Sequence, residues 1–155
     1  MNIVSLKIIS GGQTGADRAA LEFAIKNGIP HGGWCPKGRR SEDGQIDAKY
    51  QLQETPSSNY LQRTEWNVRD SDGTVIFSIS EHLSGGSLKT VEFANKHRKP
   101  HLHLSAASKD NAAQELQKWI HQNNVRVLNV AGPRASKEPK VAEFVITTLN
   151  AALKP

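Results

Sequence analysis

The sequence predicts an α/β protein built on a doubly wound, mostly parallel sheet with helices on both faces. Apolar strand patterns and amphipathic helix patterns alternate four or five times along the 155 residues, and such alternation is typical of parallel strands joined by right-handed crossovers. Glycine-bearing turns follow three of the expected strands, at the sheet edge where this class of fold binds ligands. The length suits one domain covering residues 1–155.

The N-terminal third contains one clear strand and one clear helix. Residues 3–10 form an apolar run that predicts a buried strand, and residues 15–27 have the apolar spacing of a helix that stops at Gly28. The short apolar stretch 29–35 predicts a second strand, although its glycines and proline weaken the pattern. Residues 36–57 are polar and irregular, and a loop this long in a compact domain is usually functional or mobile.

The rest of the chain continues the alternation. A helix is expected in "SSNYLQRTEWNVRDSD", with Ser57 or Ser58 as its N-cap. The elements expected after it are, in order, a strand in "GTVIFSIS", a helix over 88–97, a strand in "KPHLHLS", a helix over 112–123, a strand in "VRVLNVAG" and a final helix over 141–152.

Charge and composition narrow the classes of partner. The chain has 20 Lys and Arg against 15 Asp and Glu, an excess that suits an anionic ligand, but no block of like charges predicts a nucleic-acid-binding arm. The single cysteine, Cys35, excludes an internal disulfide and favours a reducing compartment. No leader or membrane-length apolar run is visible, so we expect a cytoplasmic protein with no membrane partner.

The glycine turns predict an anion-binding site. The first amides of a helix have no partner within the helix and carry partial positive charge, and glycine lets a ligand oxygen approach them without meeting a Cβ. A phosphate group fits this arrangement; the alternative is that the glycines only allow tight turns. The turn residues expected to contact the ligand are Gly11, Gly12, Gln13, Thr14, Gly15, Gly85, Gly86, Ser87, Thr90 and Arg134.

The loop after the second expected strand adds basic side chains. Lys37, Arg39 and Arg40 could close over an anionic ligand, because guanidinium groups match oxyanion geometry; the alternative is a solvated basic loop. Phosphate contacts alone would give weak net binding once the cost of association is subtracted. We therefore expect a flat ring system in the ligand, bound either by stacking on Trp34 or Tyr50 or by hydrogen bonds to the edge of the ring.

Stricter motifs are absent or incomplete. The first turn lacks the dinucleotide G-x-G-x-x-G spacing, and Arg39 stands where a Walker motif has lysine. His101 and His103 share a strand face without a third ligand nearby in sequence, so no catalytic metal is inferred. Cys35 has no evident activating base and is interpreted as structural.

Five stretches of the chain carry a family resemblance. In order, they are "SGGQTGADRAAL", "GGWCPKGRRSEDG", "RTEWNVRDSDGTVI", "SGGSLKT" and "LNVAGPR". Together they resemble the molybdenum carrier family, also called molybdenum cofactor carrier proteins. The resemblance covers about residues 8–150. It implies a Rossmann-like fold, homo-oligomeric assembly, and binding of the molybdenum cofactor, a phosphorylated pyranopterin dithiolene. It implies storage, protection or delivery to molybdoenzymes, not catalysis. The phosphate would bind the glycine turns, and Lys37, Arg39, Arg40 and Arg134 would form a basic rim.

A wider resemblance gives an alternative. "SDGTVIFSISEHLSGGSLKTVE" is similar to the phosphate-binding motif of Lonely Guy type phosphoribohydrolases, with Gly85, Gly86 and Glu92 at matching positions. Three positions depart from that motif: Ser84, Leu88 and Lys89. This resemblance implies a nucleoside-monophosphate hydrolase in which Glu92 and Arg63 would act on the substrate. A third reading is a sensor that binds a nucleotide and changes its assembly.

Overall fold

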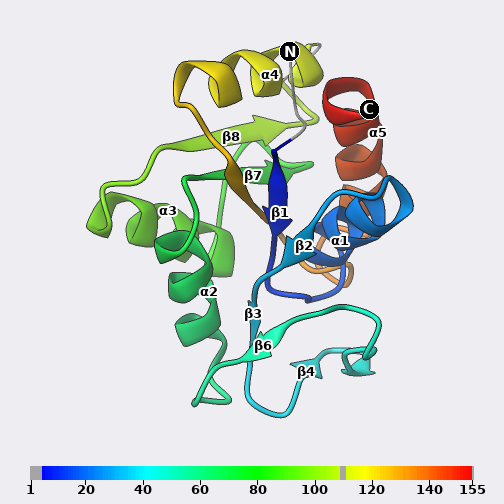
Figure 1. The fold of residues 1–155 in the computed structure, drawn as a ribbon, viewed down its shortest axis with the longest axis vertical. Coiled ribbons are helices and arrows are strands. Elements are labelled where there is room, and N and C mark those ends of the chain that lie inside the picture. Colours follow the sequence, from blue (N-terminus) through cyan, green and yellow to red (C-terminus); the bar gives the residue numbers. More distant parts are fainter. Residues whose placement is uncertain (1–4, 109–110, 155) are drawn as a thin grey trace.

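The computed structural model describes residues 5–108 and 111–154 and contains a parallel sheet (Figure 1). Within the described residues the sheet has five strands in the order β2-β1-β9-β7-β8, and every neighbouring pair is parallel. The strands are β1 (Lys7–Ile9), β2 (His31–Gly32), β7 (Gly73–Ser78), β8 (His101–Ser105) and β9 (Val127–Ala131). The expected first strand is thus present as β1; residues 3 and 4 of that expectation lie outside the described residues.

Helices cover both faces of this sheet, and the expected α/β fold class is confirmed (Figure 1). One layer is formed by α1, α4 and α5, in which α5 packs against both α1 and α4, and α2 packs with α3 in the other layer. The helices are α1 (Ala16–Lys26), α2 (Tyr60–Arg69), α3 (Gly85–Lys96), α4 (Ala112–Gln122) and α5 (Val141–Leu153). All six residues of β7 are buried, as expected for a strand covered on both sides. No helix in the described part of the chain is both long and apolar enough to span a membrane.

The last strand of the chain lies in the middle of the sheet. β9 pairs with β1 on one side and with β7 on the other, and its Leu128 and Val130 are fully buried. Asn129 of β9 donates a hydrogen bond from its side-chain amide to the Thr74 hydroxyl of β7 at 3.1 Å. The connection that leaves β9 therefore starts at the centre of the carboxyl edge of the sheet.

Three element boundaries differ from the expectation. The strand expected over 29–35 is divided into β2 and β3 (Trp34–Cys35), because Gly33 adopts a φ of 127° and approaches the backbone of Ser10. The N-cap of α2 is Asn59, whose side chain accepts a hydrogen bond from the Leu61 amide at 2.8 Å. The prediction that Ser57 or Ser58 caps this helix was therefore wrong. α3 begins at Gly85 and not at Leu88, which places both glycines of "SGGS" in its first turn.

The segment 36–57 is not an irregular loop, so that expectation was wrong. It contains the hairpin β4 (Arg40–Ser41) and β5 (Gly44–Gln45), and β6 (Gln53–Glu54), which pairs with β3. Its apolar side chains Ile46, Tyr50 and Leu52 form a small core with Leu21 of α1 and Cys35 of β3. The chain in this segment is thereby held over the first glycine turn.

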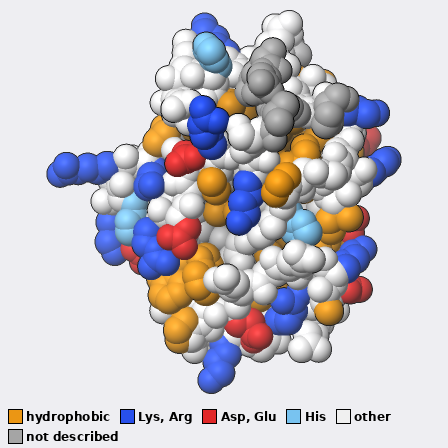
Figure 2. Space-filling view, viewed as in Figure 1, with side chains coloured by type: hydrophobic (Ala, Val, Ile, Leu, Met, Phe, Trp, Pro, Cys, Tyr) orange, Lys and Arg blue, Asp and Glu red, His pale blue; other side chains and the backbone are white. Residues whose placement is uncertain are grey.

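The face of the molecule seen in Figure 2 is mixed in charge. Lys and Arg side chains are spread among neutral and acidic ones on this face and do not gather in one patch. The sign of the net charge alone therefore does not locate a binding site here.

Candidate functional site

A cleft of about 360 Å³ lies at the carboxyl edge of the sheet, where the fold predicts a ligand. Its walls come from α2, from the N-terminal turn of α3 and from the connection between β9 and α5. The residues that line it are Gln13, Asp17, Tyr60, Leu61, Arg63, Thr64, Ser84, Gly85, Gly86, Ser87, Thr90, Ala131, Gly132, Pro133, Arg134, Ser136 and Lys137.

The N-terminus of α3 presents free amides at this cleft. Within the described residues, the amides of Gly85, Gly86 and Ser87 have no hydrogen-bond partner, and the Ser84 side chain does not cap the helix. A Cβ on Gly86 would meet no atom within 4 Å, so the backbone there is open to a ligand. Thr90 is buried and donates from its hydroxyl to the Gly86 carbonyl at 3.0 Å, which fixes the first turn. The structure thus places Gly85, Gly86, Ser87 and Thr90 together.

Two cations reach the cleft from the connection after β9. Arg134 lines the cleft, with its guanidinium 5.3 Å from the centre of the Tyr60 ring. Lys137 extends to the opposite wall, where its ammonium donates to the Ser84 hydroxyl at 2.6 Å. Lys137 was not predicted from the sequence, although its position three residues after Arg134, in the same turn after a strand, was an available signal.

An ion pair forms the floor of the cleft. Arg63 Nη1 lies 3.1 Å from Asp17 Oδ2, and the two side chains are 17% and 5% exposed. Burial raises the pKa of Asp17 and lowers the pKa of Arg63, and their mutual attraction opposes both shifts. Arg63 was expected at a site only under the hydrolase alternative, and the structure places it in the same cleft as Gly85 and Gly86.

The first glycine turn is covered by the protein itself. A Cβ on Gly11 would lie 2.2 Å from Arg63 Nη1, one on Gly12 2.6 Å from Leu52 Cδ1, and one on Gly15 2.5 Å from the Pro133 carbonyl. Two amides here have internal partners: Gln13 N–H donates to the Asp17 carboxylate at 3.3 Å, and Ala16 N–H donates to the Pro133 carbonyl at 3.3 Å. The protein's own atoms thus approach the backbone of this turn, and the Gln13 side chain lines the cleft.

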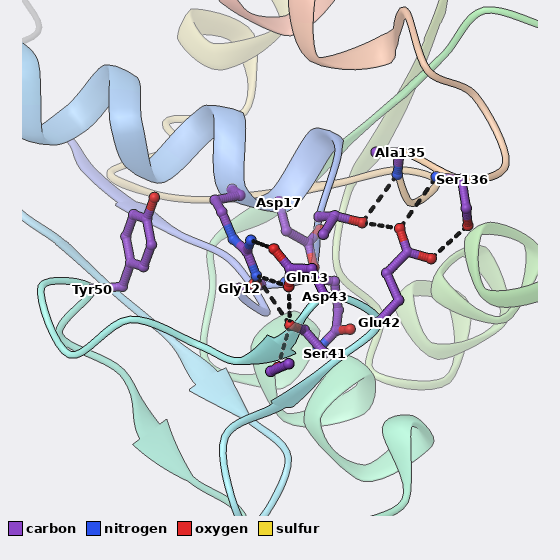
Figure 3. Close-up of polar contacts among 12 residues, drawn as sticks. Gly12, Gln13, Asp17, Ser41, Glu42, Asp43, Tyr50, Ala135 and Ser136 are labelled. Atoms are coloured by element: carbon purple, nitrogen blue, oxygen red, sulfur yellow. Dashed lines mark hydrogen bonds and ion pairs between the residues drawn. The ribbon is translucent and has the colours of Figure 1, made fainter.

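Thr14 belongs to a network that fastens the β4–β5 hairpin to the β9–α5 connection (Figure 3). Its hydroxyl donates to Glu42 and accepts from the Ala135 amide, while Glu42 also accepts from the Ser136 amide and hydroxyl. Hydrogen bonds from Ser136 and Thr14 lower the pKa of Glu42. Thr14 is thus occupied by protein contacts and is not among the residues that line the cleft.

The same hairpin is held to α1 by a second contact (Figure 3). Asp43 forms an ion pair with Arg18 of α1 and accepts a hydrogen bond from Ser41. Hydrogen bonds from Arg18 and Ser41 lower the pKa of Asp43 to about 2. Two carboxylates of one short hairpin therefore attach it to two different elements.

The three basic residues of the segment 36–57 have different environments. Arg39 donates from its guanidinium to the carbonyls of residues 46, 47, 50 and 52, so it supports the segment itself. Lys37 is exposed and does not line the cleft. Arg40 donates to the Ser58 carbonyl, and its guanidinium lies 5.2 Å from the centre of the Tyr60 ring. Of the three, only Arg40 lies beside a residue of the cleft.

The expected stacking surfaces are elsewhere. Tyr50 is buried, its hydroxyl donates to Glu22, and burial together with this bond raises its pKa to about 12. Trp34 donates a hydrogen bond from Nε1 to Asp70 at 2.8 Å and packs edge-to-face on Trp66. Trp34 lines a different groove from the cleft that holds Gly85 and Gly86. The aromatic ring that lines the cleft is Tyr60, which the sequence analysis missed.

The remaining candidates do not face the cleft. Glu92 forms an ion pair with Lys89 at 3.1 Å on the exposed side of α3, and it is not a lining residue. His103 Nε2 lies 2.6 Å from Ser78 Oγ. No group of three or more His, Cys, Asp or Glu among the residues that the structure describes could hold a metal ion. Cys35 is buried and free, and burial raises the pKa of its thiol.

Residues 8–153 match the model of the circularly permutated YpsA SLOG family. The chain belongs to this family. It is 51% identical to a protein from Syntrophus aciditrophicus SB whose crystal structure bears the name "Putative molybdenum carrier protein", with a TM-score of 0.93 over 95% of this chain and 94% of that chain. The resemblance to the molybdenum carrier family expected from the sequence is confirmed.

More distant comparisons add no functional argument. No curated protein matches the chain. (E)-4-Hydroxy-3-methyl-but-2-enyl diphosphate reductase matches at 7% identity and a TM-score of 0.38, over 94% of this chain and 59% of that chain. A similarity at that level does not bear on the site.

Proposed function

We propose that the protein holds a phosphorylated anionic small molecule in this cleft as cargo and does not transform it. The observation that carries the proposal is the set of free amides at Gly85, Gly86 and Ser87, which face the cations of Arg134 and Lys137. Unpartnered amides at a helix N-terminus bind phosphate through hydrogen bonds and the helix dipole. A phosphate there would also be within reach of two charged donors.

The cargo we propose is the molybdenum cofactor. The 51% identical protein bears the name "Putative molybdenum carrier protein", and the cofactor is a phosphorylated pyranopterin dithiolene. Its phosphate would bind at the start of α3. Its ring system would extend toward Tyr60, beside which the guanidinium groups of Arg40 and Arg63 lie at 5.2 and 5.8 Å from the ring centre. Those cations would meet the remaining negative charge of the cargo.

The positions of the carboxylates favour a carrier role and not a hydrolase role. The acidic side chain that lines the cleft is Asp17, and it is occupied by Arg63 and by the Gln13 amide. Glu92, the acid that the hydrolase alternative would use, is paired with Lys89 outside the cleft. Homo-oligomeric assembly and delivery to molybdoenzymes belong to the same proposal, and their support is the family resemblance. A cytoplasmic location is proposed with them, and its support is the single cysteine, Cys35.

Mass spectrometry of the small molecules that copurify with the protein tests the proposal. We expect a molybdenum-containing or metal-free pterin phosphate with the unmodified protein prepared without oxygen. The double variant R134E/K137E should lose it, because both charged donors are reversed, while the exposed Lys37→Glu should retain it. Release of free base from nucleoside monophosphates would instead establish the hydrolase, and equal retention by all three proteins would exclude the cleft.

A further inference from the structure

We infer that Gln13 accepts a hydrogen bond from an N–H on the ring edge of the ligand. The cleft would then select a heterocycle that places an N–H donor beside a carbonyl, the lactam edge that pterins and guanines share. This inference rests on the proposed function and deepens it, because it names the part of the ligand that gives specificity after the phosphate has given affinity.

The side chain of Gln13 is fixed and incompletely bonded. It lines the cleft and is 3% exposed. Its Nε2 donates to the Arg40 carbonyl at 2.8 Å, and a carbonyl can only accept, so the amide group cannot be reversed. Its Oε1 has no hydrogen-bond partner within the described residues. The protein therefore holds a buried acceptor in one orientation at the cleft.

Arg63 supplies the complementary group. Its Nη1 is bonded to Asp17 Oδ2, but its Nε has no partner among the described residues. The Gln13 main-chain amide donates to the same Asp17 oxygen, at 3.3 Å. One carboxylate oxygen thus anchors both residues, and both residues line the cleft.

A lactam satisfies both groups at once. Buried polar atoms without partners are rare and costly, so a ligand that brings a donor to Gln13 and an acceptor to Arg63 Nε gains more than one that brings neither. Tyr60 lines the same cleft and offers a flat surface for the ring. The lactam N–H would donate to Gln13 Oε1, and the adjacent carbonyl would accept from Arg63 Nε.

Calorimetric titration with two nucleotide probes tests the inference. Inosine 5′-monophosphate has the lactam edge, and purine riboside 5′-monophosphate lacks both its N–H and its carbonyl at the same phosphate charge. We expect the unmodified protein to bind the inosine nucleotide about tenfold or more tightly, the scale of one or two hydrogen bonds. Gln13→Met, which removes the acceptor oxygen, should reduce this preference sharply. Gln114→Leu, exposed on α4, is the matched control.

The outcomes separate this inference from the proposed function. Equal affinities for the two nucleotides in the unmodified protein, or an undiminished preference in folded Gln13→Met, would overturn the inference. Binding of pyrophosphate but of neither nucleotide would overturn it as well and leave the anion site standing. Failure of all three probes to bind would count against the proposed function itself. If Gln13→Met does not fold, the comparison of the two nucleotides on the unmodified protein still decides the matter.

Discussion

The ammonium of Lys137 donates to the Ser84 hydroxyl at 2.6 Å and so joins the β9–α5 connection to the N-terminus of α3. The same nitrogen lies 3.3 Å from the position that a Cβ on Gly85 would take. A cation therefore stands next to the free amides of α3, with a neutral hydroxyl as its partner. An anion bound to those amides would give Lys137 a charged partner in place of a neutral one.

Replacing Lys137 by Met should weaken binding of a phosphorylated ligand by about 1.5–3 kcal/mol, the scale of a charge-assisted hydrogen bond. The stability of the free protein should change little, because the side chain is exposed. Titration with pyrophosphate at two salt concentrations measures the effect and its electrostatic character. Lys140→Met, an exposed lysine of the same connection that does not line the cleft, is the control; equal effects of the two variants would contradict the assignment.

Arg39 and Arg134 should behave in opposite ways. Arg39→Ala removes a guanidinium that donates to four backbone carbonyls, so we expect a loss of at least roughly 1.5–3 kcal/mol in the free energy of unfolding. Arg134→Ala should leave unfolding nearly unchanged and weaken ligand binding by roughly the same amount. Urea unfolding and titration on both variants check this. If Arg39→Ala instead weakened ligand binding and left the free energy of unfolding unchanged, Arg39 would have to be assigned to the binding site.

The alternation of strands and helices could be predicted because local apolar spacing determines it, but the order of the strands could not. Neighbours in a parallel sheet are distant in sequence, and nothing in "VRVLNVAG" indicates that β9 enters between β1 and β7. The segment 36–57 was missed for a similar reason. Its strands have two residues each, and the contacts that order it, such as those of Arg39 with carbonyls 7 to 13 residues further along the chain, do not follow the period of a helix or a strand.

The site was predictable in part. Glycine in a turn indicates that a close approach is allowed, but not whether a ligand or the protein makes the approach. At Gly86 the space is open, whereas at Gly12 it is filled by Leu52 from a segment forty residues away in sequence, a covering that no local pattern records. Tyr60 and Lys137 were missed because each becomes part of the cleft only through its tertiary position.

The two glycines give a direct test of this difference. Gly12 has a φ of 76° and a Cβ there would lie 2.6 Å from Leu52 Cδ1, so Gly12→Ala should lower the free energy of unfolding by more than about 1 kcal/mol. Gly86 has no positive φ and open space, so Gly86→Ala should keep or slightly raise stability while its methyl group obstructs the ligand. Thermal unfolding and pyrophosphate titration measure the two effects. A destabilised Gly86→Ala with normal binding would reverse this assignment.

The N-cap of α2 can be checked in the same way. Asn59→Ala should lower the free energy of unfolding by about 1 kcal/mol, because the Leu61 amide loses its acceptor. Ser58→Ala should cost much less, since Ser58 is not the cap residue that the sequence suggested. Chemical denaturation of both variants decides between them, and a larger loss for Ser58→Ala would restore the original prediction.

The attachment of the β4–β5 hairpin should depend on pH through Asp43. The pKa of this carboxyl is about 2 in the folded protein and 3.8 in its ordinary range, because Arg18 and Ser41 bind the charged form. A depressed pKa means that the contribution of Asp43 to stability is complete above about pH 3.8 and is lost as the pH falls through about 2. Unfolding midpoints of the unmodified protein and of Asp43→Asn should therefore differ most at pH 5–6 and converge toward pH 2.

Asp47→Asn is the control, because in the described residues the Asp47 side chain accepts only from the nearby Lys49 amide. A difference between the first two proteins that stays constant from pH 6 to pH 2 would show that the hairpin is not held by this ion pair.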